Sequence, residues 1–124
     1  MRLREALDVK TGAVIAFVGA GGKTTALARL ARECAADGLR VLATTTTRIA
    51  GEELTLFDRA ETLGAVGEVA PCERGQALFV YDRSEGAKAL GIAPDRLAGL
   101  MAMLRPDVTL IEADGARRLP LKLP

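Results

Sequence analysis

The sequence contains no histidine and no tryptophan, and among its 124 residues there are only one tyrosine and three phenylalanines. Without histidine the chain lacks the usual general base, the usual zinc ligand and every catalytic Ser-His arrangement. Because aromatic residues are scarce, alanine, valine, leucine and isoleucine must fill the core. With 49% hydrophobic and 27% charged residues, the composition is that of an ordinary globular protein, long enough for one small domain.

The sequence also lacks a strong excess of charge of one sign and has no long hydrophobic run. The formal net charge is only +1, and no basic stripe carries interleaved aromatic residues, which disfavours nucleic-acid binding. No apolar run approaches the ~20 residues of a membrane span. The charged N-terminus lacks the apolar core of a signal peptide. We therefore expect a cytoplasmic protein with neither nucleic-acid nor membrane partners.

The two cysteines, Cys34 and Cys72, form no C-x-x-C pair and give no indication of an oxidising compartment. Cys34 falls on the apolar face of a predicted helix, where it is expected to be a small core residue. Cys72 follows Pro71 in a predicted loop. A reactive thiol is one interpretation there, and a structural cysteine is the favoured one.

The N-terminal third of the chain predicts a strand, a helix and a second strand. Residues 13–18 form a continuous apolar run suited to burial on both faces of a sheet. Residues 24–37 repeat apolar side chains at helical spacing, and residues 40–45 form the second strand. Such a βαβ unit almost always crosses over right-handed into a parallel sheet.

The remaining elements are less evenly marked. The clearest are strands over residues 76–81 and 108–112 and a helix that begins at Pro94. Residues 54–57 predict a short strand, and residues 82–91 a polar loop with at most one helical turn. Together these elements predict the α/β class with a mainly parallel sheet.

The most informative segment, residues 17–25, reads Phe-Val-Gly-Ala-Gly-Gly-Lys-Thr-Thr between the first strand and the first helix. This is the setting of a phosphate-binding loop, because glycines let the backbone approach an anion and a helix N-terminus attracts negative charge. Phe17 stands where the full pattern has its first glycine, which predicts a shorter loop. The alternative is a glycine-rich turn with an incidental lysine. The candidate nucleotide-binding residues are Gly19, Ala20, Gly21, Gly22, Lys23, Thr24 and Thr25.

A second group of candidates lies where the strand over residues 108–112 ends. Glu112 and Asp114 are two residues apart, so in an extended chain they point to the same side. Ligands of parallel α/β sheets bind at the carboxyl ends of strands, the edge where Lys23 and Thr24 are also expected. We expect Thr24, Glu112 and Asp114 to hold Mg²⁺ or its waters. The alternative is a pair of solvated acids in a turn.

Two further segments carry weaker signals. The run Thr44–Thr47 ends the second strand at the same edge, and its hydroxyls, that of Thr46 among them, could contact phosphate oxygens or water; a β-branched strand end is an equal alternative. Arg48 could reach developing charge, although a solvated arginine is favoured. Beyond the acids, the cations Arg117, Arg118 and Lys122 could neutralise them, bind an anionic substrate or form a solvated turn.

With these residues in hand, the chain resembles the selenium-dependent molybdenum hydroxylase accessory protein family, often called YqeC. The matching segments are residues 18–25 (Val-Gly-Ala-Gly-Gly-Lys-Thr-Thr), 41–47 (Val-Leu-Ala-Thr-Thr-Thr-Thr) and 111–124 (from Ile-Glu-Ala-Asp-Gly to Leu-Pro). They come in the family's order and span nearly the whole chain, and the third is the most specific.

The resemblance implies one P-loop NTPase-like nucleotide-binding domain over residues 1–124, a three-layer α/β/α arrangement that forms the N-terminal part of a longer protein. It implies an accessory role in maturing selenium-dependent molybdenum hydroxylases, with such an enzyme or its cofactor precursor as partner. The cofactors would be Mg²⁺ with ATP or GTP, and the catalytic residues Lys23, Glu112 and Asp114. Because the chain contains no asparagine, the guanine-reading Asn-Lys-x-Asp motif cannot occur in these 124 residues, which favours ATP. The motif could lie in the remainder of the longer protein, so GTP stays open.

Two other functions fit the same residues. The short glycine loop is similar to that of Mur-type ligases, so an ATP-dependent ligase or kinase could act on a small anionic cofactor precursor, with Arg117, Arg118 and Lys122 as its anion clamp. A non-catalytic module that binds nucleotide and docks a partner enzyme is the other alternative.

Overall fold

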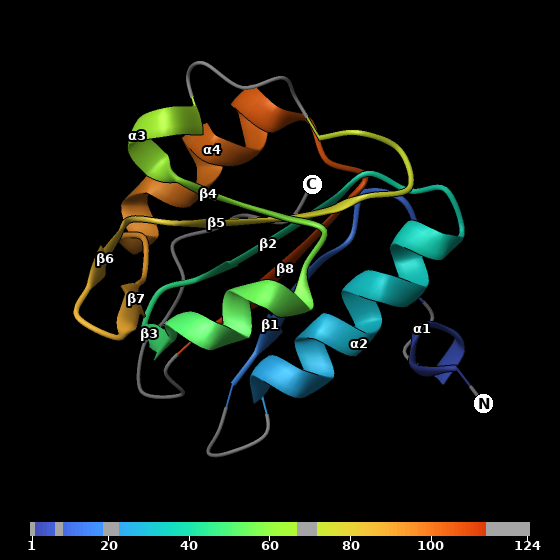
Figure 1. Cartoon of the computed structure of the whole chain (residues 1–124). Coiled ribbons are helices and arrows are strands. Elements are labelled where there is room, and N and C mark those ends of the chain that lie inside the picture. The colour runs from blue at the N-terminus through green and yellow to red at the C-terminus, as the bar shows by residue number, and fades with distance from the viewer. Residues whose placement is uncertain (1, 7–8, 19–22, 67–71, 114–124) are drawn as a thin grey trace.

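The computed structural model describes residues 2–6, 9–18, 23–66 and 72–113. At its centre lies a five-stranded sheet with the strand order β1-β8-β2-β5-β4, in which every neighbouring pair is parallel (Figure 1). Its strands are β1 (Val14–Phe17), β2 (Val41–Thr45), β4 (Arg59–Thr62), β5 (Ala77–Tyr81) and β8 (Val108–Glu112). The predicted α/β class and mainly parallel sheet are therefore confirmed.

Helices cover both faces of this sheet. On one face α2 (Lys23–Ala36) packs against β8 and β2, with α1 (Leu3–Ala6) beside it. On the other face α4 (Leu97–Leu104), preceded by the 3₁₀ turn η2 (Pro94–Arg96), and α3 (Leu63–Val66) pack on a second cluster of apolar side chains. Because the central strands are buried on both faces, they read as continuous apolar runs in the sequence.

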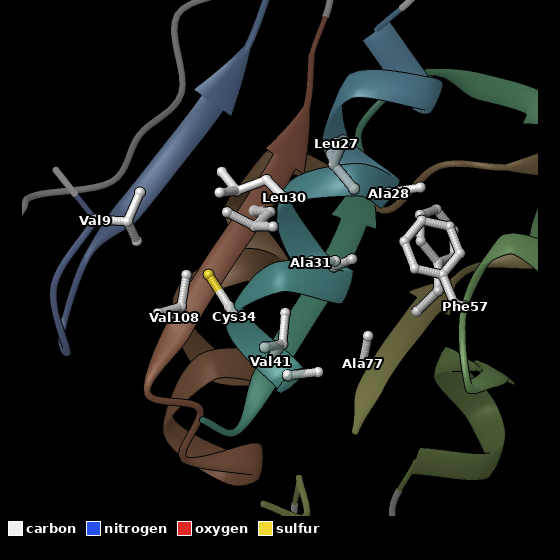
Figure 2. Packing of buried hydrophobic residues seen from close by; sticks show 14 of the residues in the cluster. Val9, Leu27, Ala28, Leu30, Ala31, Cys34, Val41, Phe57, Ala77 and Val108 are labelled. Carbon is white, nitrogen blue, oxygen red and sulfur yellow. The ribbon is translucent and has the colours of Figure 1, made fainter. Parts of the chain in front are cut away.

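The larger core lies between α2 and the sheet, as Figure 2 shows. Leu27, Leu30, Ala31 and Cys34 recur at helical spacing along α2, and each of them is fully buried. Burying a leucine in this way contributes about 2 kcal/mol of stability. The apolar stripe predicted over residues 24–37 is thus the face that joins α2 to the sheet.

Both cysteines are buried and free. Burial raises the pKa of the Cys72 thiol to about 11, which leaves little thiolate at neutral pH. Its Sγ lies 3.9 Å from the carbonyl oxygen of Val41. The structure therefore supports a structural cysteine at this position and argues against a reactive thiol.

The first strand departs from expectation. β1 is an edge of the five-stranded sheet among the described residues, with β8 as its one neighbour. Its residues are half-buried or, at Ala16, exposed. The prediction that this run is buried on both faces is therefore wrong, because an edge strand has fewer neighbours to cover it.

A second, smaller sheet replaces the loop predicted over residues 82–91. It is antiparallel, has the order β3-β7-β6, and consists of β3 (Arg48–Ala50), β6 (Arg83–Glu85) and β7 (Lys88–Leu90). Gly86 has φ 59° between β6 and β7, the backbone that a tight hairpin turn needs at its first central position. The loop prediction failed because every residue of β6 is exposed, so no apolar alternation marks this strand.

The strand predicted over residues 54–57 is also wrong. Gly51–Leu56 form the 3₁₀ helix η1. Two local hydrogen bonds favour the helical turn: the Glu53 carboxylate accepts from the Ala50 N–H at 3.1 Å, and the Thr55 hydroxyl donates to the Glu52 carbonyl at 2.8 Å. Side-chain bonding to the nearby backbone therefore outweighed the β propensity of this segment.

Candidate functional site

The candidate site lies where α2 begins and where β8 and β2 end. Lys23 and Thr24 are the first two residues of α2, and Glu112 is the last residue of β8. In the sheet register Glu112 pairs with Phe17 of β1 on one side and with Thr45 of β2 on the other. The carboxyl ends of three parallel strands and the positive end of a fourteen-residue helix therefore meet here.

A buried hydrogen bond joins the two sequence motifs. Thr24 Oγ1 donates to Glu112 Oε2, and the two residues keep only 8% and 5% of their surface exposed. A buried carboxylate is unfavourable unless donors or positive charge compensate for the lost water. The Thr24 hydroxyl supplies one donor, and Thr24 belongs to the first turn of α2, the end of a helix that carries partial positive charge.

Lys23 reaches the same strand end. Its Nζ donates to the carbonyl oxygen of Ala113 at 3.2 Å, directly beyond Glu112. Among the residues that the structure describes, no carboxylate lies within ion-pair distance of Lys23. The ammonium group is thus held at the site by a neutral acceptor, and it can form an ion pair with an incoming anion.

The threonines at the end of β2 differ in whether their hydroxyl groups are hydrogen-bonded. Thr44 Oγ1 donates to the Val80 carbonyl at 2.6 Å, and Thr45 Oγ1 accepts from the Thr47 N–H at 3.1 Å, so the fold itself uses these two hydroxyls. Thr46 Oγ1 is buried and has no hydrogen-bond partner within the described ranges. The Thr46 N–H donates to the Glu112 carbonyl at 2.9 Å, which fixes Thr46 beside the site.

Other predicted residues are not part of this cluster or cannot be placed. Thr25 is exposed in the first turn of α2, and Arg48 is exposed on β3, in keeping with the favoured solvated interpretation of that arginine. Several predicted site residues lie outside the described part of the chain: Gly19, Ala20, Gly21, Gly22, Asp114, Arg117, Arg118 and Lys122.

The site contains the oxygen donors that a hard cation prefers. The Thr24 hydroxyl and the Glu112 carboxylate already lie within hydrogen-bond distance of each other. Within the described ranges no group of three or more histidine, cysteine, aspartate and glutamate side chains could hold a metal ion by itself. Mg²⁺ fits such a site, because it commonly takes one or two protein ligands and completes its shell with water and phosphate oxygens.

One contact that supports the site could not be predicted from the sequence. The position of a Cβ on Gly91 would lie 2.2 Å from the Thr47 carbonyl oxygen and 2.6 Å from the Thr46 carbonyl carbon. The Ile92 N–H donates to the Thr45 carbonyl at 2.8 Å. The chain that leaves β7 therefore packs directly on the threonine run, which only a glycine at position 91 permits.

Fold and site together define a parallel α/β domain in which the Lys-Thr start of a helix lies against a buried carboxylate at a strand end. The family model described as YqeC protein matches residues 15–124, and the chain belongs to the YqeC family. It is 35% identical over 122 residues to the "Uncharacterized protein YqeC" of Escherichia coli (strain K12). The alignment covers 93% of this chain and 45% of that relative, so the chain spans less than half of its length.

A comparison with solved structures finds no match. In the described part of the chain, no helix has both the length and the apolar composition needed to cross a membrane. The family match and the relative from Escherichia coli confirm the resemblance to the YqeC family seen in the sequence.

Proposed function

We propose that this chain binds a nucleoside triphosphate together with Mg²⁺ and acts as a nucleotide-dependent accessory protein. The observation that carries the proposal is the buried hydrogen bond between Thr24 and Glu112, with Lys23 beside it. Two motifs that lie far apart in the sequence place a mobile cation, a hydroxyl and a carboxylate at one helix N-terminus. These are the groups that binding of a metal–triphosphate requires.

Each residue has a defined task in this proposal. Gly19 to Gly22 would surround the phosphates with backbone N–H groups, and Lys23 would leave the Ala113 carbonyl to contact the β and γ phosphates. The Thr24 hydroxyl can keep donating to Glu112 while one of its lone pairs faces the metal. Glu112, together with Asp114, would hold the remaining metal-bound waters. When bound, Mg²⁺ neutralises charge on the phosphate oxygens.

Phosphoryl transfer would ask little covalent chemistry of these residues. The reaction needs alignment of the terminal phosphate and stabilisation of its charge, which Lys23 and the helix N-terminus can provide. ATP is the proposed nucleotide because these 124 residues contain no asparagine with which to build the guanine-reading motif. GTP stays the alternative, since that motif could lie in the rest of the longer protein.

Membership of the YqeC family supports the proposed setting. On that ground we place the activity in the cytoplasm, in the maturation of selenium-dependent molybdenum hydroxylases, with such an enzyme or its cofactor precursor as partner. The site geometry supports nucleotide binding in particular, and hydrolysis is the further step that a kinetic measurement must establish.

The test is isothermal titration calorimetry of Mg-ATP and Mg-GTP on the natural full-length protein and its Lys23→Ala variant. Charge-assisted contacts to phosphate are worth about 1.5–3 kcal/mol each, so affinity should fall by roughly 10- to 150-fold. Lys88→Ala is the matched control, because Lys88 is an exposed lysine on β7. Equal affinity of wild type and Lys23→Ala, or no binding by wild type with either nucleotide, contradicts the proposal.

A further inference from the structure

One side chain beside the site is not explained by the needs of the fold. Thr46 is 92% buried, since only 8% of its surface remains exposed, and its Oγ1 has no hydrogen-bond partner among the residues that the structure describes. Buried hydroxyl groups are nearly always hydrogen-bonded. A buried hydroxyl without a partner has lost its hydrogen bonds to water and gained none in return, which destabilises the fold. A valine has almost the same shape and would avoid this loss of stability. The stability of the fold therefore does not explain a hydroxyl group at position 46, and binding of a ligand would.

The neighbouring threonines make the contrast clear. The hydroxyls of Thr44 and Thr45 are buried as deeply but are bonded to the Val80 carbonyl and the Thr47 N–H. Hydroxyl groups on this strand end can thus be satisfied by the protein where they serve the fold. Of these three hydroxyls, only that of Thr46 makes no hydrogen bond to any residue that the structure describes.

The backbone of Thr46 is held firmly next to the candidate metal ligand. Its N–H donates to the Glu112 carbonyl at 2.9 Å, and the preceding residue, Thr45, pairs with Glu112 in the sheet register. On the other side Gly91 packs against the peptide that joins Thr46 to Thr47. The Thr46 hydroxyl is therefore carried by a fixed backbone beside Glu112, at the strand end that Lys23 and Thr24 also contact.

We propose that the Thr46 hydroxyl is a ligand contact that donates a hydrogen bond to an oxygen of the terminal phosphate of the bound triphosphate. This inference rests on the proposed function and assigns one residue to the γ position. Rotation about χ1 moves Oγ1 of a threonine between staggered positions without moving the backbone, so the hydroxyl can reorient when an acceptor arrives. The free protein carries an unsatisfied hydroxyl, and the triphosphate supplies its acceptor.

The proposal predicts two effects of opposite sign for Thr46→Val. In calorimetry without nucleotide the melting temperature should rise, by on the order of 3 °C, because an unsatisfied hydroxyl is replaced by a methyl group. In titrations with the non-hydrolysable imido analogue of the triphosphate and Mg²⁺, affinity should fall about fivefold or more. Affinity for the diphosphate should stay within twofold of wild type, because the contact is to the γ group.

Thr46→Ser is the conservative control, since it keeps the hydroxyl, and it should restore triphosphate affinity to within about twofold of wild type. A lower melting temperature for Thr46→Val, an unchanged triphosphate affinity, or equal losses for triphosphate and diphosphate would each overturn the inference. Wild-type binding that Lys23→Ala abolishes and Thr46→Val leaves intact overturns this inference alone. Absence of wild-type binding overturns the proposed function itself.

Discussion

The hydroxyl of Thr24 donates a buried hydrogen bond to the carboxylate of Glu112, 88 positions further along the chain. It links the first turn of α2 to the end of β8 and so joins the two segments that the sequence marks as functional. The bond should also stabilise the fold. Glu112 is almost fully buried, and a buried carboxylate is unfavourable unless hydrogen-bond donors replace the water it has lost.

Removing the Thr24 hydroxyl should destabilise the protein even without ligand. Thr24→Val keeps the shape of the side chain but takes one donor from a buried carboxylate, which should lower the free energy of unfolding by about 1.5–3 kcal/mol. Thr25→Val is the matched control: this neighbour is exposed, and its substitution should change stability by less than about 0.5 kcal/mol. Urea unfolding of both variants provides the measurement. Equal stability of Thr24→Val and wild type would show that the hydrogen bond contributes nothing.

Two glycine substitutions should change stability in opposite directions. At Gly91 a Cβ would lie 2.2 Å from the backbone oxygen of Thr47, and since backbone cannot yield as a flexible side chain can, Gly91→Ala should cost about 2 kcal/mol or more. At Gly99, in α4, nothing lies within 4 Å of the added carbon. Gly99→Ala should therefore stabilise the helix by about 0.5–1 kcal/mol. Thermal unfolding of the two variants tests whether the chain after β7 packs closely on the threonine run. A Gly91→Ala protein as stable as wild type would contradict this close packing.

The parts of the fold that could be predicted are those with a strong apolar period. Leu27, Leu30 and Cys34 mark the buried face of α2, and the apolar runs of β2, β5 and β8 lie within or near their predicted bounds. The exposed β6, with no apolar residue facing inwards, could not be found in this way. Nor could the edge position of β1, since an apolar run does not reveal how many neighbours its strand has.

The candidate site was partly accessible to the same reasoning. Its location follows from chain direction, because parallel strands bring their carboxyl ends, and hence Lys23, Thr24 and Glu112, to one edge of the sheet. The division of the threonine run was not accessible. The Thr44 hydroxyl bonds to a neighbouring strand, whereas the Thr46 hydroxyl has no partner in the part of the chain that the structure describes. This difference depends on contacts between distant segments.

Stability should depend on acidity through Asp37, which follows α2. Arg2 donates to Asp37 Oδ2 at 2.7 Å, and Arg4 donates to the same oxygen. The hydrogen bond from Arg2, followed by that from Arg4, lowers the pKa of the Asp37 carboxyl below its ordinary value. A carboxyl with a lower pKa in the folded state stabilises the fold at pH values above its unfolded pKa.

Asp37→Asn should therefore lower the melting temperature by a constant amount between about pH 5 and pH 7, where Asp37 is charged in both states. The gap should narrow as the pH falls below about 4 and passes through the folded pKa, because the wild-type carboxyl is then also neutral. Added salt should narrow the gap too, since the pair is partly exposed. Asp95→Asn is the control, because Asp95 is exposed and forms no ion pair among the described residues. A gap that persists unchanged down to pH 2 would show that the two arginines do not stabilise the charged form of Asp37.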